Sequence, residues 1–410
     1  MARELDDWLT RYLQYTQHSE PPTSYHTWCG LSLLAGTLQR RVFLRMGFET
    51  LYPNLYIVLV GPAGRSRKGV ALGIAKDLLK KVTGISLAPE STSGREAIIQ
   101  ALKRARANQD LEDGRVKYHC SLTAISEELS VFLGQGDTKL LANLTNWYDC
   151  QDDWAYETIG RGLDSLQGLC FNFLGGTAPE WIQSMLPSEA IGGGFTSRVI
   201  FIVEENKGKT VPEHDLTEEE KMLAEFLTQD LERIAQLNGQ FQFTPESKQA
   251  YVDWYMESDK LIRVGKYPVN DPRFAAYCDR RQTHLRKIMM LFSVSRGDSL
   301  ELTVEDFHRA VDALIKAEAK MARTFGGLGR ARFGDATQKI EDFIRLMGIT
   351  TRSSLLAKFR LDVDSQALSV IEQTLEQRKV ISVKLLAQKG EKVYEWIESP
   401  NLGSMPRDQG

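Results

Sequence analysis

The chain has 410 residues, of which 42% are hydrophobic and 26% charged, and its formal net charge is −3. This composition is typical of a folded globular chain and excludes wholesale disorder, while the charge excludes a protein that coats nucleic acid over its whole surface. The length suggests about two or three domains, and any nucleic-acid binding must come from a local patch.

The cysteines are scattered without CxxC spacing, which predicts reduced thiols rather than a zinc site or a disulfide framework. The N-terminus is polar and acidic, and no apolar run approaches the roughly 18 residues that a membrane span needs. We therefore expect a cytoplasmic protein with no membrane partner.

Residues 1–51 are predicted to be an N-terminal helical segment. Apolar side chains recur at helical spacing from Trp8, the pair Pro21-Pro22 breaks the pattern, and a second helix is predicted from Trp28 to Leu44.

Residues 52–215 switch to alternating strands and helices. Leu55 to Val60 is an unbroken apolar run, typical of a strand buried on both faces, and it leads into a glycine-rich loop and a helix from Val70 to Val82. Strand, glycine-rich loop with lysine, and helix form the order of a P-loop. A capping box at Ser93 is predicted to open a helix from Ala97 to Ala107. Further strands are predicted at Cys120 to Ile125, Leu169 to Leu174 and Val199 to Val203.

This segment therefore predicts an α/β P-loop NTPase core, an open and mostly parallel sheet flanked by helices. Residues 216–332 show no strand signal and predict a helical lid domain. Its helices are expected at Glu218 to Leu237, Pro245 to Ile262, Phe274 to Ser295 and Val304 to Arg323.

Residues 333–398 predict a winged-helix-like module, because three helix signals precede two short strands, and residues 399–410 predict a flexible tail. Basic and acidic side chains balance in the module, and its third helix carries Glu372 and Glu376, which suits a DNA groove poorly. DNA binding and protein docking both stay open. The lysines of the wing that could touch phosphates are Lys384, Lys389 and Lys392.

The loop after Val60 is predicted to bind the phosphates of ATP, because backbone N–H groups and a helix N-terminus converge on phosphate oxygens there. Lys68 is the expected phosphate lysine and Arg67 the alternative. The pattern departs from the common one, since no Ser or Thr follows the lysine; Ser66 is the available hydroxyl for Mg²⁺. The expected nucleotide-binding residues are Gly61, Gly64, Ser66, Arg67, Lys68, Gly69 and Val70.

Two carboxylates follow the predicted strand at Cys120 to Ile125. A nucleotide hydrolase needs one acidic group to hold Mg²⁺ and a second to polarise the attacking water. If Glu127-Glu128 is aligned with the usual Asp-Glu pair of such hydrolases, Glu127 holds the metal and Glu128 polarises the water. If Ser126-Glu127 is aligned with that pair instead, Glu127 becomes the base. Acids at a helix N-terminus also occur for capping reasons alone.

Two further strand ends carry polar groups. Thr177 is expected at the carboxyl edge of the sheet, where it either senses the γ-phosphate or caps the helix that begins at Pro179. Arg198 heads a buried strand after three glycines, and an arginine there is costly to bury without an anion.

The order of these parts resembles the AAA+ and superfamily 3 type of helicase ATPase. The amino-acid sequences of these segments resemble more closely still a family of P-loop proteins from phages, prophages and plasmids that are often fused to or encoded near primases. The resemblance covers about residues 20–330. It is carried by Pro53-Asn54-Leu55-Tyr56, Arg67-Lys68-Gly69, Ser126-Glu127-Glu128-Leu129, Gly176-Thr177-Ala178-Pro179-Glu180-Trp181 and Gly193-Gly194-Phe195-Thr196-Ser197-Arg198.

The resemblance implies roles that spacing does not show. It makes Arg198 an arginine finger on the γ-phosphate of a neighbouring subunit, so that the active form would be a ring, with a hexamer as the expected form. It makes a lid arginine a second sensor, and the candidates are Arg280, Arg281 and Arg286. Relatives often carry Ser or Thr where this chain has Val70, which puts Mg²⁺-dependent turnover in doubt.

Residues 154–163 alternate and then turn on glycines, which predicts a hairpin. Ring helicases of the similar kind place such a hairpin in the central pore, so Arg161 is the expected contact to the backbone of single-stranded DNA and Lys139 the second choice. A solvated turn that tolerates arginine is the alternative.

We therefore expect an ATP-dependent, ring-forming DNA helicase or translocase of a phage or mobile element, working with ATP and Mg²⁺ in the bacterial host cytosol beside a primase or polymerase. The alternative is a nucleotide-binding scaffold or loader with weak or no hydrolysis. A winged-helix transcription regulator with an ATPase switch is a third hypothesis, which the neutral module disfavours.

Overall fold

The computed structural model is a mixed α/β protein with two compact units, Met1–Phe325 and Gly326–Gly410. No helix among the residues placed by the structure is long and apolar enough to cross a membrane. The structure describes residues 3–90, 92–110, 116–134, 137–158, 162–186, 192–213, 215–325, 334–360, 363–386 and 391–397.

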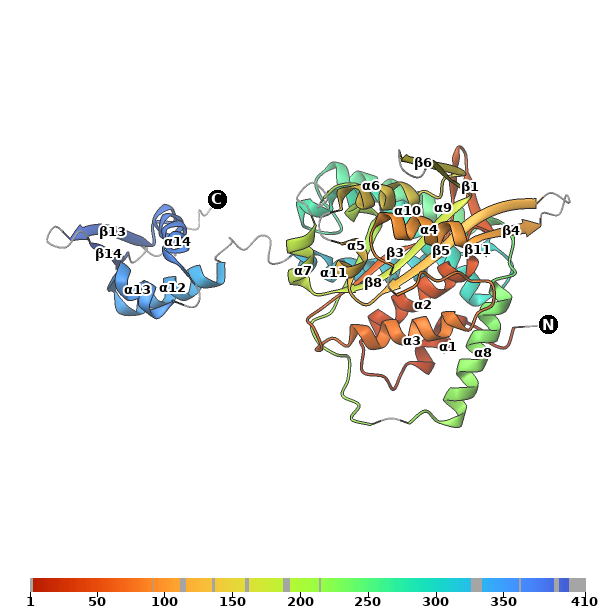
Figure 1. Cartoon of the computed structure of the whole chain (residues 1–410), viewed down its shortest axis with the longest axis horizontal. Helices are drawn as coiled ribbons and strands as arrows, with labels where there is room; N and C mark the ends of the chain where they lie inside the picture. The colour runs from red at the N-terminus through yellow and green to blue at the C-terminus, as the bar shows by residue number, and fades with distance from the viewer. Residues whose placement is uncertain are drawn as a thin grey trace, which may run out of the picture. The chain divides into compact units, whose positions relative to one another are not determined.

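The first unit is built on a five-stranded sheet with helices on both faces (Figure 1). The strands β3, β8 and β9 are buried along their whole length, which explains why the sequences of β3 and β9 are unbroken apolar runs. Four strands are parallel, and β4 pairs antiparallel at one edge. In spatial order the strands are β4 (Arg106–Asp110), β5 (Val116–Ser126), β8 (Leu169–Thr177), β3 (Tyr56–Val60) and β9 (Val199–Val203).

The helices of this unit surround the sheet; α2 and α3 pack on β8, α4 on β5 and α11 on β9. They are α1 (Trp8–Tyr15), α2 (Thr23–Leu38), α3 (Lys68–Lys80), α4 (Arg95–Arg104), α5 (Leu129–Leu133), α6 (Thr138–Trp147), α7 (Pro179–Met185), α8 (Glu218–Ile234), α9 (Pro245–Arg263), α10 (Ala275–Arg296) and α11 (Val304–Met321).

A second sheet corrects two predictions. The helix predicted from Trp28 to Leu44 ends at Leu38, where Gln39 takes a left-handed φ of 55°, and a strand follows. Strands also occur within residues 216–332, where none was predicted. These segments pair with partners far away in the sequence, which local periodicity does not register. The order is β11 (Glu301–Leu302), β10 (Gly239–Phe243), β1 (Val42–Met46) and β2 (Glu49–Leu51).

The predicted capping box at Ser93 is not formed. The N-cap residue of α4 is Gly94, without a side-chain cap bond, and the expected end of this helix instead forms the edge strand β4. The predicted hairpin, in contrast, is confirmed: β6 (Asp153–Thr158) pairs antiparallel with β7 (Gly162–Gln167).

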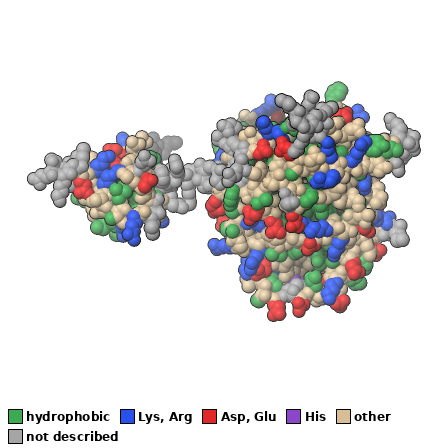
Figure 2. All heavy atoms as spheres, in the orientation of Figure 1, with side chains coloured by type: hydrophobic (Ala, Val, Ile, Leu, Met, Phe, Trp, Pro, Cys, Tyr) green, Lys and Arg blue, Asp and Glu red, His purple; other side chains and the backbone are tan. Residues whose placement is uncertain are grey.

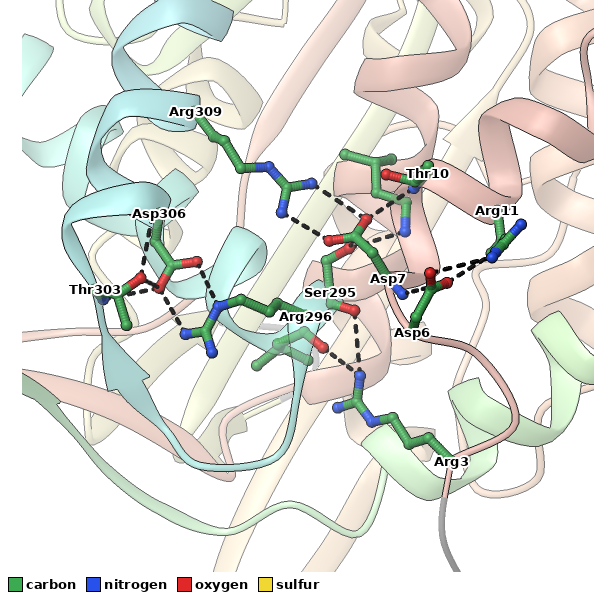
Figure 3. Close-up of polar contacts among 12 residues, drawn as sticks. Arg3, Asp6, Asp7, Thr10, Arg11, Ser295, Arg296, Thr303, Asp306 and Arg309 are labelled. Carbon is green, nitrogen blue, oxygen red and sulfur yellow. Dashed lines mark hydrogen bonds and ion pairs between the residues drawn. The ribbon is translucent and has the colours of Figure 1, made fainter.

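The N-terminal segment is tied to α10 and α11 through one carboxylate (Figure 3). Asp7 accepts hydrogen bonds from Ser295 at 2.9 Å, from Arg309 at 2.7 and 3.2 Å, and from the Thr10 amide at 2.9 Å, which caps α1. Burial raises the pKa of Asp7, but these bonds outweigh it and hold the pKa below its ordinary value. One hydrophobic core runs from Trp8 to Phe325, so the segments predicted as N-terminal, core and lid pack together.

In the described residues of the second unit there are three helices and a three-stranded antiparallel sheet of order β12-β14-β13. The helices and the final hairpin follow the predicted order, and β12 is an additional strand. Its core includes Ile340, Leu355 and Leu368. The elements are α12 (Gly334–Met347), β12 (Ile349–Thr351), α13 (Arg352–Lys358), α14 (Ser365–Gln377), β13 (Ile381–Leu386) and β14 (Glu391–Trp396).

Acidic and basic side chains are interspersed over the face shown in Figure 2. This face therefore offers no broad area of a single sign, in keeping with the small net charge of −3.

Candidate functional site: a glycine-rich loop facing two carboxylates

The glycine-rich loop, residues 61–67, joins the buried strand β3 to helix α3. Gly61 donates its N–H to the carbonyl of Thr177 at 3.1 Å, so the start of the loop is pinned to β8. Gly64 and Arg67 both take left-handed backbone angles, with φ of 67° and 58°. No side chain caps α3, which leaves the first-turn amides open to an anion.

Lys68 is folded back onto this loop. Its Nζ donates to the carbonyl oxygens of Gly61 and of Pro62, the latter at 3.3 Å, and only 9% of the residue is exposed. Burial lowers the pKa of Lys68, while Glu128 and Glu180 act in the opposite direction. The ammonium is therefore held by neutral carbonyls, which a phosphate group can replace.

Arg67, the alternative phosphate ligand, points elsewhere. It is half-exposed and forms an ion pair with Glu20 at 2.7 Å, in the segment before α2. The geometry therefore favours Lys68 over Arg67 as the cation of the loop.

The expected hydroxyl ligand does not face the open side of the loop. Ser66 is fully buried and donates to the Pro62 carbonyl at 3.3 Å. Val70, at the position where a hydroxyl would be useful, is 45% exposed. A direct metal contact by Ser66 would need the loop to rearrange.

Glu127 and Glu128 follow the end of β5, and both are exposed. A Cβ built on Gly69 would lie 3.3 Å from Glu127 Oε2, which places this carboxylate against the first turn of α3. The charge of Glu128 acts on Lys68 and raises its pKa against the effect of burial. The Ser126 hydroxyl donates to the Glu128 carbonyl at 3.0 Å and fixes the turn that carries them. The two carboxylates and the loop thus share one edge of the sheet.

Thr177 ends β8, the strand that lies between β3 and β5. It is 1% exposed, and its hydroxyl donates to the Ala178 carbonyl at 3.2 Å. The N-cap residue of α7 is Ala178, without a side-chain cap bond, so the capping role predicted for Thr177 is wrong. Thr177 lies beside the loop but is turned away from the surface.

A pocket of about 280 Å³ lies between the start of α2, the end of β9 and α11. Its wall is largely apolar, with Trp28, Val203 and Ala317, and carries Glu204 at the rim. Glu204 donates its N–H to the Val60 carbonyl at 2.9 Å, and its carboxylate bonds Lys320 at 2.7 and 2.8 Å. Sequence reasoning missed this pocket because three distant segments form it.

Arg198 and Arg281 are not brought to the loop. Because β9 runs parallel to β3 with Val199 opposite Tyr56, Arg198 lies at the sheet edge opposite the loop. It is 6% exposed and bonds Asp149 at 2.8 Å. Arg281 bonds Glu318 through two nitrogens at 2.6 and 2.8 Å and is also buried.

The other candidate lid arginines and the predicted DNA contact Lys139 are not gathered at one site. Arg286 bonds Glu49 at 2.7 Å, and Arg280 is half-buried. Lys139 is exposed on α6, and Arg161 lies outside the described residues. No cluster of three or more metal-ligating side chains occurs in the part of the chain that the structure describes.

Comparison with models of known protein families and with curated protein sequences finds no match.

Proposed function

We propose that the chain is an ATP-dependent motor of the AAA+ and superfamily 3-like kind that acts on single-stranded DNA in the replication of a phage or mobile element. One observation carries the proposal. Lys68, under a glycine-rich loop, is bonded to neutral carbonyls, while the carboxylates of Glu127 and Glu128 stand exposed beside it. A cation without a carboxylate partner facing an open helix N-terminus suits a phosphate chain.

The roles of the residues follow from their places. Lys68 and the first amides of α3 would take the phosphates, and Glu127, which lies against that turn, would hold Mg²⁺. When bound, Mg²⁺ supplies charge neutralisation on the phosphate oxygens. Glu128 would accept the proton of the attacking water. The pocket at Trp28 has the size and apolar wall for a nucleobase.

The P-loop class is supported by the place of β8, which separates the loop strand β3 from the acidic strand β5. A ring, with a hexamer as the expected form, gives Arg198 a role that it cannot have inside its own chain. Arg198 lies at the opposite edge, so only a neighbouring copy could bring it to a phosphate, and its bond to Asp149 would first have to open.

The second unit is proposed to be a winged-helix module that docks on protein. Glu372 is buried and accepts hydrogen bonds from Arg352 at 2.9 Å and from Lys392, and Lys384 bonds Glu395 at 2.5 Å. These wing lysines are already neutralised, which favours a primase or polymerase surface over DNA as the partner. Lys389 lies outside the described residues.

A nucleotide-binding scaffold or loader is the second candidate function. The buried hydroxyl of Ser66 and the exposed side chain of Val70 favour it, because both weaken Mg²⁺ coordination. Such a protein would assemble on DNA with ATP and turn it over slowly or not at all.

The test measures ATP hydrolysis by the full chain with and without single-stranded DNA, and particle mass with a non-hydrolysable analogue. Glu128→Gln should lower turnover about 100- to 10,000-fold while leaving nucleotide binding intact, since it removes a proton acceptor. Lys68→Ala should abolish nucleotide binding. Glu90→Gln is the matched control, an exposed carboxylate bonded to Lys76 away from the loop.

Turnover that survives Glu128→Gln would overturn the carboxylate assignment. ATP-dependent assembly without turnover would establish the scaffold instead. Nucleotide binding that survives Lys68→Ala would remove the loop from the proposal altogether.

A further inference from the structure

A second polar pocket lies at the sheet edge opposite the glycine-rich loop. It has a volume of about 520 Å³ and is bounded by the β1–β2 hairpin, the start of β5 and the turn after α6. Tyr52 precedes β3 and Lys117 begins β5, which places the pocket at the amino ends of the parallel strands. It is therefore separate from the nucleotide site.

One face of the β1–β2 hairpin lines this pocket. Successive side chains of a strand alternate between its faces. The face that carries Leu44 and Leu51 packs in the core. The opposite face lines the pocket and carries alternating aromatic and polar groups, namely Phe43, Arg45, Thr50 and Tyr52.

Phe48 stands at the tip of this hairpin and is fully exposed. Gly47, beside it in the turn, takes a left-handed φ of 58°, which favours glycine. A single exposed aromatic ring needs no explanation by itself. Here, however, the ring is part of the pocket wall together with Arg45 and Lys117.

The charges of the pocket are unbalanced in favour of cations. Its carboxylates are engaged: Asp149 bonds Arg198 at 2.8 Å, and Asp152 bonds Arg40 at 2.6 Å. Arg40 is held in the wall, with its guanidinium 4.4 Å from the centre of the Tyr52 ring. Among the residues that the structure describes, no salt bridge engages Arg45 or Lys117, and both are exposed, while the charge of Asp152 acts on Lys117 from a distance.

We propose that this pocket and the β1–β2 hairpin bind single-stranded nucleic acid, with Phe48 stacking on a base and Arg45 and Lys117 on flanking phosphates. Alternating rings and cations match a chain that alternates bases and phosphates, and base stacking is tolerant of sequence. What the protein would do with the bound strand rests on the proposed function. Binding of the strand itself needs no nucleotide hydrolysis. The surface is distinct from the hairpin that carries Arg161.

The experiment measures binding of the full chain to labelled deoxythymidine and ribouridine oligonucleotides by fluorescence anisotropy, without nucleotide and over a range of salt. Phe48→Ala should weaken binding about tenfold, with the salt dependence unchanged, because one stacking contact is lost without a change of charge. Phe48→Trp should restore the affinity. Met256→Ala, an exposed apolar residue of α9, is the matched control.

The double variant Arg45→Ala/Lys117→Ala should also weaken binding, but by a different route. It should reduce the slope of log affinity against log salt by about 0.7 for each phosphate contact removed. Lys260→Ala, an exposed cation of α9, should leave the slope unchanged. The two oligonucleotide arms report whether the strand is DNA or RNA.

Wild-type affinity in both Phe48→Ala and the double variant would overturn the inference. A change of particle mass without a change of strand affinity would also overturn it, and would make the hairpin a contact between copies. Failure of the proposed function is seen separately, since a Phe48-dependent affinity in a chain without ATP turnover would leave this inference standing.

Discussion

A lysine from another element lies at each end of strand β3, Lys68 of α3 at one end and Lys287 of α10 at the other, and the two have related surroundings. Lys68 bonds the carbonyls of Gly61 and Pro62, just after the strand, and Lys287 bonds the Asn54 side chain at 2.6 Å and its carbonyl at 3.0 Å, just before it. Both ammonium groups are held by neutral oxygens. Lys68 borders an open loop, whereas Lys287 is 1% exposed and lies 3.9 Å from the centre of the Tyr148 ring.

The two lysines differ in whether an anion can reach them. A charge held by carbonyls is costly in either place, but only at the loop can an anion reach it and replace those carbonyls. At the opposite end the lysine is a clamp between α10 and the start of β3. His284 packs in the same region, and burial lowers its pKa to about 3, so it stays neutral there.

The largest expected effect is on the pH dependence of stability and concerns Lys287, the lysine that is buried away from water. Burial lowers the pKa of Lys287 from 10.5 to about 8, with Cys150, Cys170 and Asp149 opposing and Arg198 adding to the shift. Between these pH values the unfolded chain binds more protons at this group, so the unfolding free energy should rise with pH by up to about 1.4 kcal/mol per unit relative to Lys287→Met. Urea unfolding of both proteins from pH 7 to about pH 10 measures the difference.

The Cys150 thiol is a titrating neighbour, so the comparison should be repeated with Cys150→Ala in both proteins. A difference that stays flat with pH would mean that Lys287 is not sealed from water. The contrast between the two ends of β3 would then be lost.

The next largest effect is expected at the other end of β3, where Gly61 begins the glycine-rich loop. A Cβ on Gly61 would lie 2.5 Å from Ser66 Oγ and 2.7 Å from the Tyr25 hydroxyl, and would also overlap the Glu204 carbonyl. Gly61→Ala should therefore lower the unfolding free energy by about 1–3 kcal/mol and weaken nucleotide binding, because the loop must shift. Urea unfolding and nucleotide titration check both effects.

Gly73→Ala is the matched control on α3, since a Cβ there meets nothing within 4 Å. It should be neutral or stabilise by up to about 1 kcal/mol, because alanine favours a helix over glycine. Equal effects at the two glycines would show that the packing around the loop is loose.

The smallest effect concerns Arg198. Its bond to Asp149 predicts a coupling energy of about 1 kcal/mol in a double-mutant cycle of Arg198→Ala and Asp149→Ala, because the carboxylate is half-exposed and screened by water. Urea unfolding of the four proteins measures it. An absence of coupling would mean that Asp149 does not hold Arg198 in solution, and only its bond to the Gly194 carbonyl at 2.9 Å would then have to open for an action across a subunit boundary.

Local sequence patterns predicted much of the fold. The buried strands at Leu55 to Val60 and Val199 to Val203 are apolar runs, and the later helices begin at threonine caps such as Thr217 and Thr303, so neighbouring residues carry the information. The pairing of Val42 with Gly239 could not be predicted, because a strand partner so distant in the sequence leaves no local trace. The pocket at Trp28 was missed for the same reason.

The sequence by itself determined the order of the elements and the residue types at the loop, since both follow from short-range chemistry. The tertiary structure decided which charges are available. It turned Ser66 inward, paired Arg67 with Glu20 and Arg198 with Asp149, and left Lys68 beside exposed carboxylates. Whether a charge binds a ligand or its own chain depends on what packs against it, and packing joins residues that the sequence keeps apart.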